Sequence, residues 1–249
     1  MMFDTHFHLD LLPNMNELIR NFPYVDCGVI GVGTIPRAYE KELKFMKDMK
    51  NIHVALGLHP QLVGTRESDI DLFLNLLGKT RFVGEIGLDF KSAFQITRNE
   101  QVDCFVKITN ACAKEGNKVL SIHSVKAASV VLGVLEAACA FQTCACIFHW
   151  FTGSAVERER AIQDGAYFSI NPKMLKTNSG KETIKAIPAD KILLETDAPF
   201  AIPVTSVSAL QSELQKLVIG ISSIKGKDVS MQIEKNMEDI INFGTNAIY

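Results

Sequence analysis

Eight short apolar runs alternate with helical segments along this chain of 249 residues, and this alternation restricts the available folds more than any other feature. The runs cover residues 2–8, 27–32, 54–58, 82–87, 119–123, 144–149, 166–170 and 192–197. Most are continuously apolar rather than alternating with polar residues, as expected for parallel strands that are covered on both faces. The runs therefore predict an α/β protein built on a parallel sheet.

Helical segments separate most of these runs and follow the last of them. The expected helices are residues 37–50, 69–77, 99–115, 129–141, 154–164, 181–186, 210–225 and 231–243. Gly78, Gly116 and Gly165 stand where three of the helices should end. Right-handed crossovers between eight parallel strands favour a closed barrel, and about 200–250 residues is a usual size for one. We therefore expect a single TIM (β/α)8-type barrel domain over residues 1–249.

An open sheet of the flavodoxin or Rossmann type is the alternative fold. Residues 28–33 read GVIGVG, which does not place its glycines in the GxGxxG frame of a dinucleotide site. No linker rich in proline, glycine or serine divides the chain. A dinucleotide cofactor therefore has little support.

Charge and hydropathy argue against several classes of protein. The formal net charge is −2 and the isoelectric point is about 6.3, unlike a large basic surface that holds long duplex nucleic acid. No stretch reaches the roughly 18 uninterrupted apolar residues of a membrane span, and residues 1–6 lack the positive flank of a signal peptide. We expect a cytoplasmic protein that does not bind a membrane.

Six side chains of metal-binding type stand at the C-terminal ends of the apolar runs. They are His6, His8, Glu85, His123, His149 and Asp197. The C-terminal ends of barrel strands form one rim where active sites are built, so we expect the six to meet there. Imidazole and carboxylate groups can hold one or two divalent ions, and this donor set admits Zn, Mg and Mn. Since such ions lower the pKa of bound water, the pattern favours a metal-dependent hydrolase.

The local context of these side chains leaves some alternatives open. His6 and His8 are two residues apart and so project from the same face of a strand. Glu85 is a carboxylate inside an apolar run, where either a cation or a salt bridge to lysine or arginine must compensate its burial. Asp197 precedes a turn, where aspartate is also a common cap or turn residue. Because the last strand of a closed barrel neighbours the first, we expect Asp197 near His6 and His8.

Three further side chains are candidates for contact with a substrate. His59 follows the third run and is a candidate for phosphate contact or for protonation of a leaving group, with a turn histidine as the alternative. Lys126 and Lys173 follow the fifth and seventh runs, where each could contact a phosphate or remain in solvent. These three residues extend the candidate site toward a substrate.

Six motifs occur in order along nearly the whole chain. They are residues 4–10 (DTHFHLD), 57–60 (GLHP), 84–89 (GEIGLD), His123, 149–154 (HWFTGS) and 195–199 (ETDAP). As a set they resemble the TatD family of metal-dependent deoxyribonucleases, in the amidohydrolase-like barrel group. The resemblance implies two ions joined by Glu85, one held by His6, His8 and Asp197 and the other by His123 and His149. It also implies that an activated water attacks phosphorus, with Glu85, Asp197 and His59 as catalytic residues.

Two departures from the family pattern concern residues expected to bind nucleic acid. The family usually has His-x-Arg after the fifth strand, whereas this chain has HSVK at 123–126. The Lys126 ammonium group, one position further along, is a point charge and not the equivalent of a two-pronged guanidinium. A basic stretch that the family typically carries near the C-terminal motif is replaced here by the neutral residues 200–205. Trp150 and the run SINPK at 169–173 resemble the divergent branch found in Qat-type anti-phage defence systems, which implies companion proteins.

Three functions are compatible with these observations. The first is a metal-dependent deoxyribonuclease that removes nucleotides from single-stranded DNA ends, which need only a few phosphate contacts. The second is a metal-dependent hydrolase of an amide, ester or lactone, because related barrels use similar ligands for many hydrolyses. The third is an accessory subunit of a multi-protein defence complex with weak or conditional nuclease activity. Retention of all six side chains of metal-binding type argues against the third.

Overall fold

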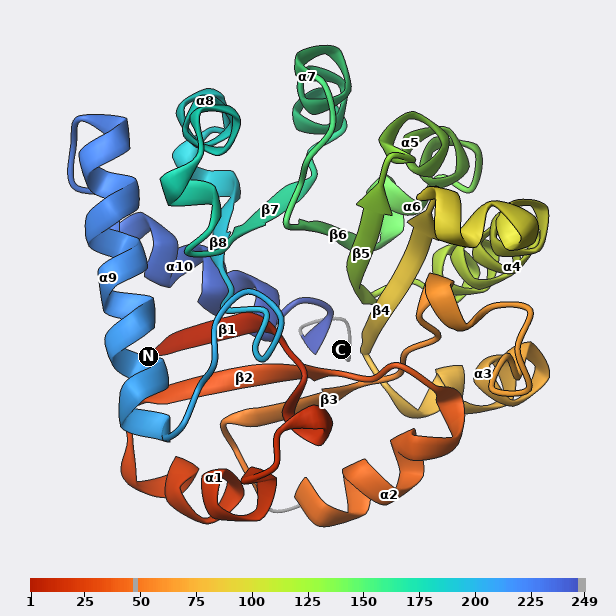
Figure 1. Cartoon of the computed structure of the whole chain (residues 1–249), viewed down its shortest axis with the longest axis horizontal. Helices are drawn as coiled ribbons and strands as arrows, with labels where there is room; N and C mark the ends of the chain where they lie inside the picture. Colours follow the sequence, from red (N-terminus) through yellow and green to blue (C-terminus); the bar gives the residue numbers. More distant parts are fainter. Residues whose placement is uncertain (47–48, 246–249) are drawn as a thin grey trace.

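The strands form a closed parallel barrel, and the helices surround it (Figure 1). The structure, a computed structural model, describes residues 1–46 and 49–245. In these residues the strands are β1 (Met2–Phe7), β2 (Cys27–Val32), β3 (Ile52–Ala55), β4 (Phe82–Asp89), β5 (Val119–Val125), β6 (Ala145–His149), β7 (Tyr167–Ile170) and β8 (Ile192–Leu194). The barrel expected from the alternating pattern is confirmed, and the open sheet is excluded.

Backbone hydrogen bonds close the barrel where a sheet of three strands, β1 to β3, meets a sheet of five, β4 to β8. At one seam the Leu56 amide donates to the Phe82 carbonyl at 3.0 Å, and the Gly84 amide donates to the Leu56 carbonyl at 2.9 Å. At the other seam the Asp197 amide donates to the His6 carbonyl at 3.2 Å. The first strand and the segment after the last strand are therefore side by side, as the sequence predicts.

Gly57 lets three strands approach one another at the C-terminal end of the barrel. A Cβ atom at this position would lie 1.7 Å from the carbonyl oxygen of Gly33 and 2.7 Å from that of Gly84. Gly33 follows β2 and Gly84 lies in β4, and the Gly33 amide donates to the Gly84 carbonyl at 2.9 Å. Because β2 and β4 meet here, β3 ends early: the predicted strand 54–58 is observed at Ile52–Ala55.

The helices form the outer layer of the molecule (Figure 1). They are α1 (Met15–Asn21), α2 (Pro36–Met46), α3 (Ile70–Leu76), α4 (Arg98–Glu115), α5 (Ala128–Ala137), α6 (Ala140–Thr143), α7 (Ala155–Gln163), α8 (Asn178–Ala186), α9 (Val207–Lys225) and α10 (Ser230–Ile241). Apolar side chains such as Phe105, Leu132 and Leu214 attach them to the core and are at most 1% exposed. Among the residues described, none of these helices combines the length and the hydrophobicity that a membrane span requires.

Several helix predictions differ from the structure. Residues 129–141 do not form one helix, because Cys139 adopts a left-handed conformation (φ 55°) that separates α5 from α6. Helix α8 begins three residues before the predicted start, because the Thr177 side chain caps it by accepting a hydrogen bond from an amide of its first turn. Helix α1 has no counterpart in the sequence prediction. The predicted helix 37–50 includes residues 47–48, which lie outside the described residues.

Strands β4 and β5 each continue two residues beyond their predicted ends. Gly87 pairs with His123 where the predicted runs end, and Leu88 pairs with Ser124 in the extension. A Cβ atom at Gly87 would lie 2.0 Å from the His123 carbonyl oxygen. The absence of a side chain at Gly87 therefore lets the two strands run close together. As a result Glu85 and His123 lie inside their strands rather than at the ends, and Asp89 comes beside His123.

Candidate metal centre

The carboxylate of Glu85 lies between two pairs of histidines. Its Oε2 atom is 3.5 Å from Nε2 of His6 and 3.4 Å from Nε2 of His8. Its Oε1 atom is 2.6 Å from Nδ1 of His123 and 3.3 Å from Nε2 of His149. Among the described residues no lysine or arginine forms an ion pair with this carboxylate, so the alternative of a structural salt bridge to such a residue does not apply.

Asp197 completes the group of six predicted ligands. Its Oδ1 atom lies 3.6 Å from Nε2 of His8 and 3.9 Å from Nε2 of His6. The residue stands three positions after the end of β8 and has a left-handed backbone (φ 48°). Barrel closure therefore brings it to His6 and His8 across a separation of about 190 residues in sequence, as predicted.

His59 joins the same cluster. Its Nε2 atom is 3.3 Å from Oε2 of Glu85, and its Nδ1 atom accepts a hydrogen bond from the Gln61 amide at 3.2 Å. The side chain is 14% exposed, more than that of any other histidine around Glu85. His59 thus lies where the cluster meets solvent.

The donor atoms fit a cation. Three overlapping groups can hold one: His6, His8 and Glu85; His59, Glu85 and His123; and His6, His149 and Glu195. Nδ1 of His6 contacts the Ser121 hydroxyl at 2.7 Å, whereas its buried Nε2 has no hydrogen-bond partner. A buried polar atom without a partner is unfavourable, and a metal ion would satisfy this nitrogen together with the nearby carboxylates.

The electrostatics of the cluster favour the metal-binding forms of Glu85 and His6. Burial would raise the pKa of Glu85, but the neighbouring histidines, above all His59 and His6, hold that pKa well below its usual range. Burial and the adjacent His149 hold the pKa of His6 well below its usual value. An ionised carboxylate and a neutral imidazole are the forms that bind metal ions.

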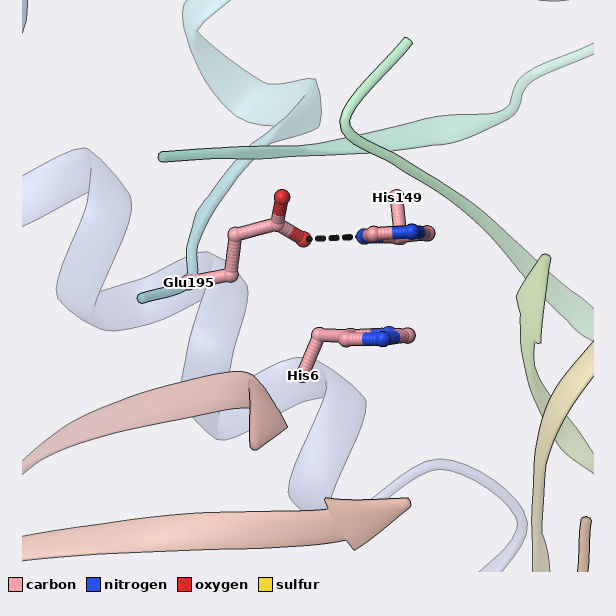
Figure 2. Close-up of side chains that lie close together, drawn as sticks. All are labelled: His6, His149 and Glu195. Atoms are coloured by element: carbon pink, nitrogen blue, oxygen red, sulfur yellow. Dashed lines mark ion pairs between the residues drawn. The ribbon is translucent and has the colours of Figure 1, made fainter. Parts of the chain in front are cut away.

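His149 is held by a carboxylate on its far side. Figure 2 shows Glu195, from the segment after β8, facing the His149 ring, which stacks on the ring of His6. Nδ1 of His149 lies 3.4 Å from Oε2 of Glu195, and the two rings are 3.7 Å apart. Burial would lower the pKa of His149, but Glu195 raises it well above its usual value. Glu195 therefore orients the imidazole so that its other nitrogen, Nε2, faces Glu85.

The pKa of Asp197 is shifted in the opposite direction to that of Glu85. Burial, together with the negative charges of Glu195 and Glu85, raises the pKa of Asp197 to about 7. Without a cation this carboxyl group is protonated in part of the molecules at neutral pH. A cation beside it would favour the ionised form.

A cavity of about 380 Å³ opens over the cluster. All the predicted ligands except the fully buried His6 line it, and Lys91, Trp150 and Phe200 form part of its wall. A larger cavity of about 880 Å³ lies at the opposite end of the barrel, around His53. In the described residues no group of side chains that could hold a metal lies there.

The chain matches known proteins over almost its whole length. A model of the family described as TatD related DNase covers residues 3–242. The chain belongs to this family. The uncharacterized metal-dependent hydrolase YabD of Bacillus subtilis is 30% identical over 215 residues, which cover 82% of each chain. The 3'-5' ssDNA/RNA exonuclease TatD of Shigella flexneri is 29% identical over 189 residues, which cover 72% of this chain and 71% of that one.

A solved structure of another TatD protein shares the fold. The TatD homolog YJJV of Escherichia coli K12 superposes with a TM-score of 0.75 over 96% of this chain and 95% of that chain, at 19% identity. The TatD resemblance of the six ordered motifs is therefore confirmed at the level of the family and the fold. The resemblance to the Qat-type branch stays a prediction.

The sequence analysis did not identify three residues that contact the predicted ligands. Asp89 accepts a hydrogen bond from Nε2 of His123 at 3.1 Å, and together with Glu85 it raises the pKa of His123 against the effect of burial. Ser121 contacts His6, and Glu195 contacts His149. Asp89 and Glu195 stand inside the quoted GEIGLD and ETDAP motifs, so a carboxylate in each motif was the available signal. Nothing in the sequence around Ser121 distinguishes it from an ordinary strand residue.

The two lysines predicted to contact phosphate lie outside the wall of the cavity. Lys126 is exposed and has a left-handed backbone (φ 54°). Lys173 is exposed too, and its Nζ atom donates to the carbonyl oxygen of Phe200 at 2.9 Å. Lys91, which the sequence analysis did not single out, does line the cavity, and its Nζ atom is 3.5 Å from Oδ2 of Asp89.

The replacement Glu195→Gln is expected to weaken metal binding by about 10–100-fold, the usual effect of removing the partner of a metal-binding histidine. The amide is neutral and so does not hold His149 in its present orientation. Titration of the metal-free protein with Zn²⁺ or Mn²⁺ against a chelating dye measures the affinity. The exposed Glu182 of helix α8 provides a control, since Glu182→Gln should leave the affinity unchanged. Equal affinities in wild type and Glu195→Gln would exclude this role of Glu195.

Proposed function

We propose that this chain is a metal-dependent deoxyribonuclease that hydrolyses phosphodiester bonds of DNA. The observation that carries the proposal is the carboxylate of Glu85, with His6 and His8 on one oxygen and His123 and His149 on the other. A carboxylate between two pairs of imidazoles is suited to bridge two cations. Membership of the TatD related DNase family and the exonuclease activity in the name of the Shigella relative support DNA as the substrate.

The six predicted ligands would hold one or two divalent ions. His6, His8 and Asp197 lie on the side of Oε2 of Glu85, and His123 and His149 lie on the side of Oε1. This mixture of imidazole and carboxylate donors suits Zn, Mn or Mg. When bound, such ions lower the pKa of water and balance negative charge on the phosphoryl oxygens.

Asp197 and His59 would move the protons of the reaction. The Asp197 carboxylate lines the cavity and can accept a proton from the attacking water once it is ionised. His59 also lines the cavity and has one nitrogen occupied by the Gln61 amide. Its Nε2 atom, which faces Glu85 and the cavity, can donate a proton to the leaving oxygen.

Lys91 would provide the contact to the phosphate that the family makes with arginine. Its ammonium group is half exposed and is paired with Asp89, which in turn contacts His123. A phosphate above His123 would therefore lie in a cavity that also contains this positive charge. Contact by Lys126 or Lys173 stays a prediction from the sequence. So few cationic contacts suit a short single-stranded end better than a long duplex.

The test is a direct comparison of substrates. We expect an end-labelled single-stranded oligonucleotide to be shortened in the presence of Mg²⁺, Mn²⁺ or Zn²⁺, with slower cleavage of the same sequence as a blunt duplex. Amide, ester and lactone substrates are assayed in parallel, because barrels with similar ligands hydrolyse many bonds. Hydrolysis of an acyl substrate with the oligonucleotide left intact would replace this proposal by the acyl hydrolase.

Removal of bound metal is expected to lower the melting temperature by about 5–10 °C, because a cation at 100 times its Kd stabilises the native state by about 2.7 kcal/mol. Differential scanning fluorimetry after dialysis against a chelator measures the change, and added metal should restore the original value. An identical melting temperature with and without metal would instead favour the accessory-subunit function. The companion proteins of such a complex stay a prediction from the sequence resemblance.

A further inference from the structure

Two aromatic side chains stand at the mouth of the cavity over the metal centre. Trp150 follows His149 directly at the end of β6, and Phe200 lies in the loop between β8 and α9. Both residues line the cavity. The Phe200 side chain is 57% exposed, and its ring lies 5.1 Å from that of His8 in an edge-to-face arrangement. An exposed phenylalanine ring directly beside a predicted metal ligand has no role in the hydrophobic core.

The neighbouring Phe151, by contrast, is a core residue. Its ring packs edge-to-face with Phe148 at 5.6 Å and with Phe168 at 5.5 Å, in the interior of the molecule. Trp150 lines the cavity and packs only in part against the core. It has a left-handed backbone (φ 39°) that L-amino acids rarely adopt. The Trp150 amide donates to Oε1 of Glu195 at 3.1 Å, which helps to hold this conformation. The local backbone therefore presents the indole to the cavity.

Lys173 connects the two aromatic residues. Its Nζ atom lies 5.0 Å from the centre of the Trp150 ring and donates a hydrogen bond to the Phe200 carbonyl at 2.9 Å. A cation over an aromatic face is attractive, so the lysine orients the indole and secures the loop that carries Phe200. The indole ring and the backbone of the Phe200 loop are thus held in position before any ligand arrives.

We propose that Trp150 and Phe200 form a stacking platform for the base of the nucleotide whose phosphate lies at the metal centre. The inference rests on the proposed function, because it assigns a nucleotide to this cavity. Planar bases stack on aromatic side chains with little regard to sequence. Only an unpaired base can leave its neighbours to occupy the platform, so the platform selects single-stranded ends. Lys91 then contacts the phosphate from the wall formed after β4.

Trp150 is the only tryptophan in the chain, so its fluorescence reports on the platform alone. The two compounds to be compared are thymidine 5'-monophosphate and deoxyribose 5-phosphate. Both contain the sugar and the phosphate, but only the first has a base. Neither contains a phosphodiester bond, so their binding does not depend on nuclease activity. With Mg²⁺ present, we expect the nucleotide to quench the fluorescence and to bind about tenfold more tightly than the sugar phosphate.

Variants measured by calorimetry separate stacking from a structural role. Trp150→Ala and Phe200→Ala should each lose most of the preference for the nucleotide, about tenfold for a lost stacking contact, while their affinity for deoxyribose 5-phosphate is retained. Trp150→Phe should keep the preference. Tyr24, which is 85% exposed and precedes β2 at the other end of the barrel, provides the control, and Tyr24→Ala should bind both ligands like the wild type.

Equal affinities of the wild type for the two ligands would overturn the platform. A loss of both affinities in Trp150→Ala or Phe200→Ala would overturn it as well, because that result indicates a structural role. A retained preference for the nucleotide without cleavage of any oligonucleotide would support the platform and reject the nuclease, so the two failures are distinguishable.

Discussion

Replacing Glu85 with glutamine is expected to slow oligonucleotide cleavage by about 10³-fold, because it removes several kcal/mol of charge stabilisation. Five histidines have a ring nitrogen near this carboxylate. A neutral amide cannot bridge two cations in their midst. The loss should appear in kcat at saturating oligonucleotide, and elemental analysis should show less bound metal in the variant.

The control for this variant is Glu136→Gln. Glu136 lies in α5 and pairs with Arg160 at a partly exposed site outside the cavity. A surface ion pair of this kind contributes about 0–1 kcal/mol to stability, so this variant should cleave DNA at the wild-type rate. Circular dichroism should show the same secondary structure in both variants. Undiminished cleavage by Glu85→Gln would contradict the bridging role of this carboxylate.

The replacement Gly57→Ala is expected to lower the free energy of unfolding by about 3 kcal/mol or more, since overfilled sites rarely relax without cost. The added methyl group would meet backbone oxygens of Gly33 and Gly84 at 1.7 Å and 2.7 Å, and backbone atoms of paired strands cannot move aside as a flexible side chain can. For a chain of this length the melting temperature should fall by about 6–12 °C. Thermal unfolding followed by circular dichroism measures this change.

Gly78→Ala is the matched control for Gly57→Ala. A Cβ atom at Gly78 would have no neighbour within 4 Å, and the residue does not have a positive φ angle. The same substitution should therefore leave the melting temperature unchanged or raise it slightly, because alanine restricts the unfolded chain. Similar melting temperatures for the two variants would show that the barrel accommodates a side chain at Gly57 without loss of stability.

Much of the fold could be predicted because strand and helix patterns are local properties. All eight apolar runs overlap a strand of the barrel, and Gly116 and Gly165 mark the ends of α4 and α7 correctly. Gly78 does not mark the end of a helical segment, because it lies within a short 3-10 helix (Leu77–Lys79) that continues α3. The errors arose where packing overrides local pattern. Strand β3 is displaced toward the N-terminus by the contact between β2 and β4. The break between α5 and α6 depends on the left-handed backbone of Cys139, a conformation that cysteine in a sequence does not predict.

The gathering of the candidate ligands could be predicted as well, and the distances around Glu85 and Asp197 confirm that they meet. Their role in binding metal stays a prediction for the experiments above. The supporting contacts of Asp89, Glu195 and Ser121 could not be predicted, because each depends on the register between neighbouring strands or on the exact path of a loop.

The sequence by itself determined the class of fold and the chemical types of the side chains at the C-terminal rim, since burial and residue type can be read one strand at a time. Only the tertiary structure decided which atoms face one another. Closure of the barrel sets the partners of Glu85, and the loops after β6 and β8 bring Trp150 and Phe200 to the same cavity. These contacts join segments far apart in the chain, and their geometry arises only when all the strands pack together.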